Sequence, residues 1–131
     1  KRWVPAEDFF KANGARASVL EDGEVVTEFK VPKAAKGAFQ KFALRKSIDF
    51  PLVNCAVAQG GDGEVRVVLG GVYPAPVRSS EAEAEVAGGV NDAAASKAGD
   101  AAVAACKPLG KNAYKVEIAR TLVKRTLMDI A

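Results

Sequence analysis

Apolar positions in the middle of the chain follow the patterns of three β-strands. Residues 39–45 alternate, with Lys41 on the face opposite Phe42 and Leu44. Residues 52–58 are apolar on both faces, which is typical of a central strand that is covered on both sides. Residues 64–69 alternate again, and the glycine-rich segment 59–63 predicts a hairpin between these last two strands.

After residue 79 the apolar period changes from two to about 3.6 residues and predicts three helices. The run Ser80-Glu81-Ala82-Glu83 is a capping box that should begin the first. Asn91 should cap a second, alanine-rich helix that ends near Cys106, before Lys107-Pro108. Asn112 should cap a third, whose apolar stripe ends at Ile130.

These elements predict an α+β fold, a three-stranded antiparallel sheet over residues 38–72 followed by three helices packed on one face.

Upstream, residues 24–31 are rich in β-branched side chains and predict a further strand, which Pro32 ends. The polar segment 33–37 is the expected domain boundary. We therefore expect residues 1–37 to be the tail of a preceding domain and residues 38–131 to be a domain of their own. Because the chain lacks a starting Met, we also expect it to be a piece of a longer protein.

Charge, hydropathy and cysteine content indicate what kind of partner and cellular setting to expect. The chain has 131 residues with 19 basic and 16 acidic side chains, a balance typical of a solvated surface rather than of nucleic-acid binding. It has no apolar run of about 18 residues, so no membrane span is expected, and residues 1–5 do not read as a signal peptide because mixed polar sequence follows them. Cys55 lies in a strand pattern and should be a buried, reduced thiol, which indicates a cytoplasmic setting.

Neither catalytic residues nor metal ligands are predicted within the chain. It contains no histidine, which excludes Ser-His-Asp and Cys-His catalysis and histidine metal sites. The glycine loop of residues 60–63 leads into a strand, and Gly70-Gly71 leads into Pro74 and Pro76. Neither segment therefore leads into the helix N-terminus that a phosphate-binding loop needs. Gly70-Gly71 is expected instead to let the backbone pass close to a neighbouring element.

Five segments in order carry a resemblance to a known family: 3–10, 24–32, 41–53, 70–78 and 114–125. Together they resemble the C-terminal portion of the FAD-binding (medium) subunit of molybdenum hydroxylases, the xanthine dehydrogenase and carbon monoxide dehydrogenase group. The resemblance implies that the subunit carries FAD between an iron–sulfur protein and a final electron acceptor. It also implies that a molybdenum cofactor on another subunit performs the hydroxylation.

By the same resemblance, Val26 and Lys41 correspond to positions that contact FAD. The family's two glycine-rich FAD-binding segments would lie upstream of Lys1, so the isolated chain is expected to be inactive and to bind FAD weakly or not at all. The implied partners are the iron–sulfur and molybdenum-cofactor subunits, with no nucleic acid and no membrane. An alternative from the residues alone is a non-enzymatic interaction domain that docks a partner subunit through a strand edge and a basic face.

Overall fold

The computed structural model describes all residues, 1–131, as a small N-terminal segment and a larger α+β unit. Residues 1–35 contain α1 (Ala6–Phe9) and a hairpin of β1 (Phe10–Asn13) and β2 (Arg16–Ser18). The larger unit contains β3 (Lys36–Phe42), β4 (Val53–Gln59), β5 (Val65–Gly70), β6 (Val77–Arg78), α2 (Ser80–Glu85), α3 (Asp92–Val103), a 3-10 turn (Gly110–Asn112) and α4 (Tyr114–Met128). The predicted α+β class is confirmed.

The main sheet has four antiparallel strands in the order β3-β4-β5-β6. The predicted hairpin joins β4 to β5, with Gly63 at a φ of 86° and the Gly60 N–H donating to the Glu64 carbonyl at 2.9 Å. The prediction of three strands missed β6. Beyond Pro76 the chain regains backbone N–H groups, so Val77 and Arg78 can pair with the free edge of β5.

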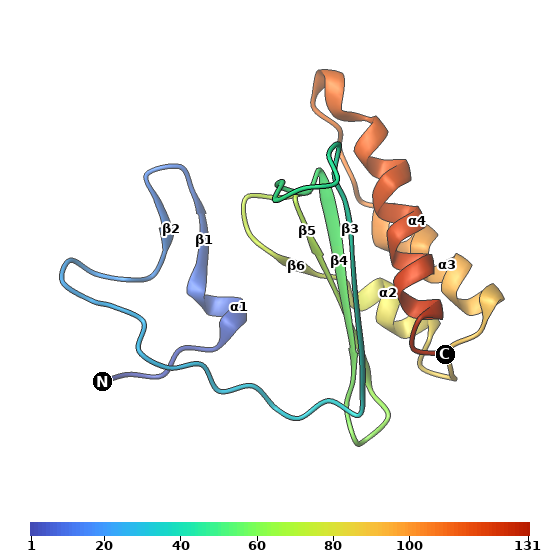
Figure 1. Ribbon diagram of the computed structural model, residues 1–131, viewed down its shortest axis with the longest axis horizontal. Helices are drawn as coiled ribbons and strands as arrows, with labels where there is room; N and C mark the ends of the chain where they lie inside the picture. Colours follow the sequence, from blue (N-terminus) through green and yellow to red (C-terminus); the bar gives the residue numbers. More distant parts are fainter.

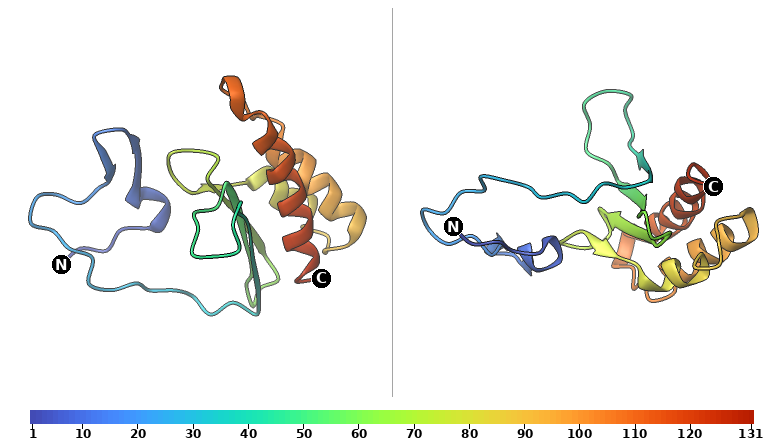
Figure 2. Two further views of the ribbon diagram at one scale, coloured as in Figure 1. Left: turned by 45° about the horizontal axis from the view of Figure 1, so that its top comes forward. Right: turned by 90° about the horizontal axis from the view of Figure 1, so that it is seen from below.

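Helices α2, α3 and α4 cover one face of the sheet, and the N-terminal segment lies on the opposite side (Figure 1). Figure 2 gives the same arrangement from two other directions. Alternate residues of β4 and β5 point into a single core with α3 and α4, as the period-two and period-3.6 patterns require. The fully buried members with the largest side chains are Val53, Cys55, Val67, Val86, Val123, Thr126 and Leu127.

The expectation that both faces of β4 are covered is wrong. Val53, Cys55 and Val57 are buried against the helices, whereas Asn54 is half-buried and Ala58 is exposed. All three helices follow the sheet in sequence and pack on the same side. Because no helix covers the other face of β4, its apolar residues, Ala56 and Ala58, lie within reach of solvent.

Two further expectations are wrong: a strand over residues 24–31, and a first sheet strand that reaches residue 45. Residues 24–31 form no strand, because they have no partner strand; side-chain ion pairs of Lys1 and Arg2 hold them instead. Strand β3 ends at Phe42 rather than at residue 45. Leu44 is thus not a core residue but lies in the following loop, where it is 78% exposed.

Two helix starts also differ from the sequence interpretation. The N-cap of α2 is Ser79, whose hydroxyl accepts from the Ala82 N–H at 3.4 Å, and Glu83 turns toward the sheet instead of closing a capping box. Asn91 caps α3 as predicted. Asn112 accepts from the Leu109 N–H at 2.6 Å and closes the 3-10 turn before α4. None of the helices has the length and apolar character that a membrane span would need.

Candidate flavin-facing site

The candidate site is the face of the main sheet that the helices leave uncovered. Directly paired residues on antiparallel strands project to the same side, so the register defines this face. We call it the open face, and its members on the three longer strands include Phe39, Lys41, Asn54, Ala56, Val68 and Gly70.

One row of the open face brings together Lys41, Asn54 and Gly70. Lys41 of β3 pairs with Asn54 of β4, which pairs in turn with Gly70 of β5. A Cβ atom on Gly70 would lie 2.6 Å from Asn54 Oδ1 and 2.8 Å from Asn54 Nδ2. The missing side chain at position 70 therefore leaves the space that the carboxamide occupies.

The ammonium of Lys41 is held by the loop that follows its own strand. Its Nζ donates to the backbone carbonyl of Asp49 at 3.1 Å. Since an ammonium group has three N–H bonds, two remain for other acceptors. The sequence-based placement of Lys41 opposite Phe42 is confirmed, because Phe42 pairs with the buried Val53 on the helix side.

The β3–β4 loop, residues 43–52, is braced by an ion pair between Arg45 and Asp49. The Asp49 carboxylate accepts from the Arg45 backbone N–H at 3.2 Å, from Nε at 3.2 Å and from Nη2 at 2.8 Å. This guanidinium holds the pKa of Asp49 below its usual value. The loop carrying Lys41's acceptor is thus fixed by charge-assisted bonds.

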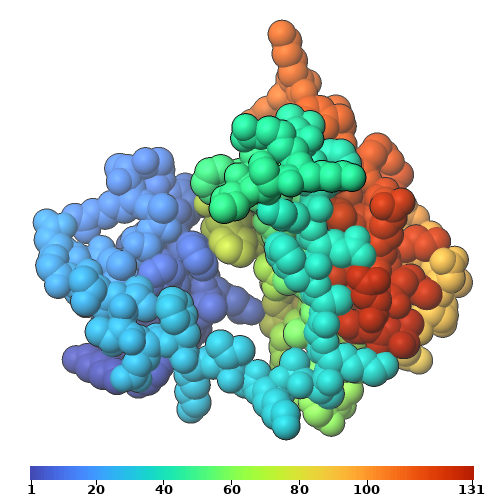
Figure 3. All heavy atoms as spheres, in the orientation of Figure 1, coloured from blue at the N-terminus to red at the C-terminus, as the bar shows by residue number.

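The same loop displays large apolar side chains. In the space-filling view it lies in the upper part of the molecule, below the orange segment near residue 110 (Figure 3). Ile48 is fully exposed at 105% and Phe50 is 91% exposed. Isolated exposed apolar residues are common on protein surfaces, but several on one braced loop are typical of a contact surface.

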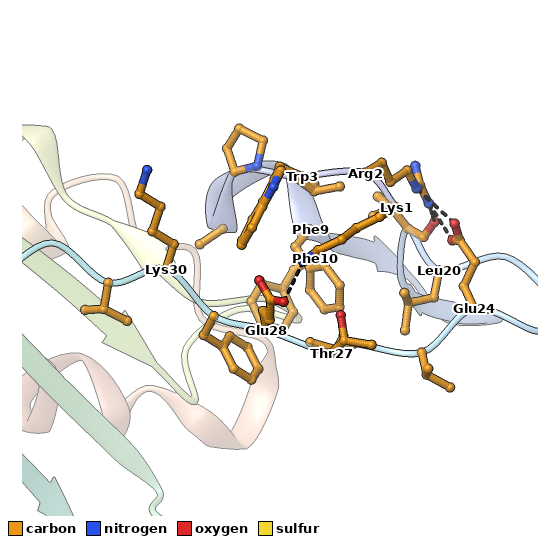
Figure 4. Close-up of a pocket in the computed structure, with 18 residues that line it drawn as sticks. Lys1, Arg2, Trp3, Phe9, Phe10, Leu20, Glu24, Thr27, Glu28 and Lys30 are labelled. Carbon is orange, nitrogen blue, oxygen red and sulfur yellow. Dashed lines mark hydrogen bonds and ion pairs between the residues drawn. The ribbon is translucent and has the colours of Figure 1, made fainter.

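Val26, the other predicted flavin contact, lies in the N-terminal segment. It lines a pocket formed wholly by residues 1–31, and Lys41 is not among the lining residues. Figure 4 shows two ion pairs among the residues that line this pocket, Arg2 with Glu24 at 2.6 Å and Lys1 with Glu28 at 2.5 Å. The structure therefore places the two predicted contacts in different parts of the chain, one in the pocket and one on the sheet.

Arg78 at the sheet edge connects these two parts. Its Nη1 lies 3.2 Å from Glu7 of α1, and its Nε and Nη2 each donate to Glu83 at 2.8 Å. Glu83 also accepts from the Val67 N–H at 2.9 Å, at the point where β6 no longer pairs with β5. Burial alone would raise the pKa of Glu83, but Arg78 and the Val67 N–H keep it below its usual value.

The cysteines make no disulfide. Cys55 is buried and Cys106 is exposed, and both are free thiols. Burial raises the pKa of the Cys55 thiol from its ordinary 9.0 to about 11, despite a hydrogen bond with Thr126 that acts the other way. No group of three or more His, Cys, Asp or Glu side chains is placed to hold a metal ion.

Sequence analysis singled out Lys41 as a candidate, but it did not single out Asn54, Asp49 or Arg78. Asn54 stands beside Lys41 only because of the strand register, which the length of the β3–β4 loop did not reveal. The Arg45-to-Asp49 spacing was a usable signal, since opposite charges that flank a short loop can pair across it. For Arg78, the nearby Glu83 offered a similar spacing, but its second partner, Glu7, lies far away in the sequence and gave no signal.

The fold is thus an antiparallel sheet with helices on one face and, on the other face, a row that carries a lysine and an amide side chain. The profile of the CO dehydrogenase flavoprotein C-terminal domain matches residues 38–130. This chain belongs to that family.

Curated relatives cover almost the whole chain. The medium chain of carbon monoxide dehydrogenase from Hydrogenophaga pseudoflava is 34% identical over 139 residues, 97% of this chain and 47% of that protein. The aldehyde oxidoreductase FAD-binding subunit PaoB from Escherichia coli (strain K12) is 30% identical over 134 residues, 98% of this chain and 39% of that subunit. The chain therefore spans half or less of the length of these relatives.

Solved structures agree with this assignment. A carbon monoxide dehydrogenase from Hydrogenophaga pseudoflava, which lacks the Mo-pyranopterin moiety of the molybdenum cofactor, matches 98% of this chain and 48% of its own with a TM-score of 0.83 and 34% identity. Quinoline 2-oxidoreductase from Pseudomonas putida 86 matches 98% of this chain and 48% of its own with a TM-score of 0.82 and 24% identity. The second likeness supports the fold alone.

Proposed function

We propose that this chain is the C-terminal part of the FAD-binding subunit of a molybdenum hydroxylase. In this role it supports electron transfer from iron–sulfur centres through FAD to an acceptor. Family membership and two relatives, one named as a medium chain and one as an FAD-binding subunit, support the proposal. Residues 1–37 would belong to the preceding FAD-binding domain, and residues 38–131 would form the C-terminal domain.

The open face suits a flat, oxygen-bearing ligand such as FAD, and this observation carries the proposal. Lys41 offers two N–H bonds, and Asn54, the residue directly opposite it on β4, places its carboxamide over Gly70. The neighbouring Ala56 and Val68 are small or β-branched and half-buried, so a planar ring can approach the sheet between them.

In this proposal Lys41 and Val26 contact FAD from the two parts of the chain. Lys41 orients the ligand by charge-assisted hydrogen bonds to its acceptor oxygens, and Val26 contributes apolar contact from the pocket of residues 1–31. Bound FAD supplies the redox chemistry, because its flavin ring accepts electrons and passes them on. The chain's own contribution is to bind, orient and partly shield the ligand.

The proposed partners are the iron–sulfur and molybdenum-cofactor subunits of one complex in the cytoplasm. The exposed Ile48 and Phe50 of the braced β3–β4 loop favour a protein contact at this end of the sheet. They also favour the alternative function, a non-enzymatic domain that only docks a partner subunit.

Co-purification and flavin reduction distinguish the two functions. The whole subunit, as its gene encodes it, is expressed together with its iron–sulfur and molybdenum-cofactor subunits, and the purified complex is mixed with a reductant that acts on the iron–sulfur centres. We expect a stoichiometric complex whose flavin absorption bleaches after the iron–sulfur centres are reduced. A complex that assembles without flavin would support the docking domain and contradict the electron-transfer role.

A further inference from the structure

We propose that Asn54 is a second ligand-binding residue on the open face, acting together with Lys41 on the acceptor oxygens of the flavin cofactor. This inference rests on the proposed function and adds a contact to it. Three observations on β3, β4 and β5 carry it: the strand register, the free hydrogen-bonding capacity of the carboxamide, and the glycine beneath it.

The register places the two residues directly opposite each other on neighbouring strands. Residues directly opposite on antiparallel strands have Cβ atoms about 4.5–5.5 Å apart, and Asn54 is directly opposite Lys41. Both project from the side of β4 that faces away from the buried Val53 and Cys55. A ligand that meets one of these side chains on this face is therefore within reach of the other.

The carboxamide of Asn54 has hydrogen-bonding capacity to spare. It takes part in none of the hydrogen bonds of the chain, although the residue is half-buried. Gln40, the nearest amide on the helix side of β3, is instead bound to Asp129 at 2.6 Å. A half-buried amide without a partner inside the protein is suited to a partner outside it, because leaving it unpaired under a ligand would cost free energy.

Gly70 and Asp49 keep the two groups in place. Any Cβ at position 70 would collide with the carboxamide, so glycine at this position gives Asn54 its space. On the other side, the Asp49 carbonyl holds Lys41 Nζ at 3.1 Å. The row thus presents two ammonium N–H bonds and an amide N–H₂ group, a donor set that fits the ring carbonyl or phosphate oxygens of FAD.

The test uses the whole subunit, stripped of flavin and titrated with FAD, with thermal melting of each variant alongside. We expect Asn54→Ala to weaken FAD binding about threefold to tenfold, the loss of one hydrogen bond, with little change in melting temperature. Asn54→Asp should lower the midpoint potential of bound flavin, because a carboxylate beside the ring disfavours added electrons. A purely structural role would not shift this potential in that direction.

Two further variants keep the outcome decisive. Gly70→Ala should weaken FAD binding in the same direction as Asn54→Ala, because it displaces the carboxamide without removing it. Gln40→Ala removes an amide from the opposite face of β3 and should leave FAD affinity and potential unchanged. If Lys41→Ala weakens binding while Asn54→Ala and Asn54→Asp have no effect on affinity or potential, the role of Asn54 is wrong. If Lys41→Ala also has no effect, the flavin role of the open face itself is wrong.

Discussion

A pair of leucine truncations tests whether the core lies on only one side of the sheet. Leu127 of α4 is fully buried, whereas Leu44 of the β3–β4 loop is 78% exposed. Leu127→Ala removes buried methyl groups and leaves a cavity, which costs about 2–5 kcal/mol of unfolding free energy. Leu44→Ala removes the same atoms from a solvated position and should change stability by no more than about 0.5 kcal/mol.

Thermal unfolding followed by far-ultraviolet circular dichroism measures both changes. For a unit of this size about 4 °C of melting temperature corresponds to 1 kcal/mol, so Leu127→Ala should lower the midpoint by about 8–20 °C. Leu44→Ala should shift it by about 2 °C at most. Equal losses for the two variants would refute the one-sided core, because Leu44 would then have to be packed inside the protein.

The other predictions concern ligand binding, backbone strain and thiol chemistry. Lys41→Ala in the whole subunit should weaken FAD binding about tenfold or more without lowering the melting temperature; unchanged flavin content would make Lys41 a solvated surface residue. Gly71→Ala should destabilise the fold more than Gly70→Ala, because Gly71 has a φ of 78° and its Cβ would lie 2.7 Å from the Leu52 carbonyl oxygen; equal melting temperatures would contradict this. Between pH 9 and 11 the unfolded Cys55 thiol ionises while the folded one stays protonated, so stability should fall by up to about 2–3 kcal/mol, a fall that Cys55→Ala should reduce. The isolated 131 residues should bind FAD weakly in calorimetric titration, because neither the glycine loop of residues 60–63 nor Gly70-Gly71 leads into a helix that could hold the phosphates; submicromolar affinity would contradict this.

The sequence predicted the elements whose patterns depend on local repetition. The β4–β5 hairpin follows from glycines between two apolar runs, and α3 follows from Asn91 and its alanine-rich repeat. The side of β3 on which Lys41 lies was also predictable, because alternation alone assigns it. In each case the deciding interactions lie within a few residues of one another.

The errors arose where distant parts of the chain decide the structure. Residues 24–31 have strand-like composition, but a strand needs a partner, and here none is provided. The alternating pattern placed Leu44 in the core because it does not mark where β3 ends. In the structure β3 ends at Phe42, and Leu44 lies in the loop that the Arg45–Asp49 ion pair braces. The pairing of Asn54 with Lys41 depends on register, which follows from the whole sheet.

The most direct test of the central claim is the flavin content of the whole subunit, purified without added cofactor. We expect the visible absorption of an oxidised flavin at about one FAD per subunit, and its loss or marked reduction when Lys41 is replaced by alanine. A folded subunit that carries no flavin and does not take it up on titration would contradict the assignment of this chain to a FAD-binding subunit.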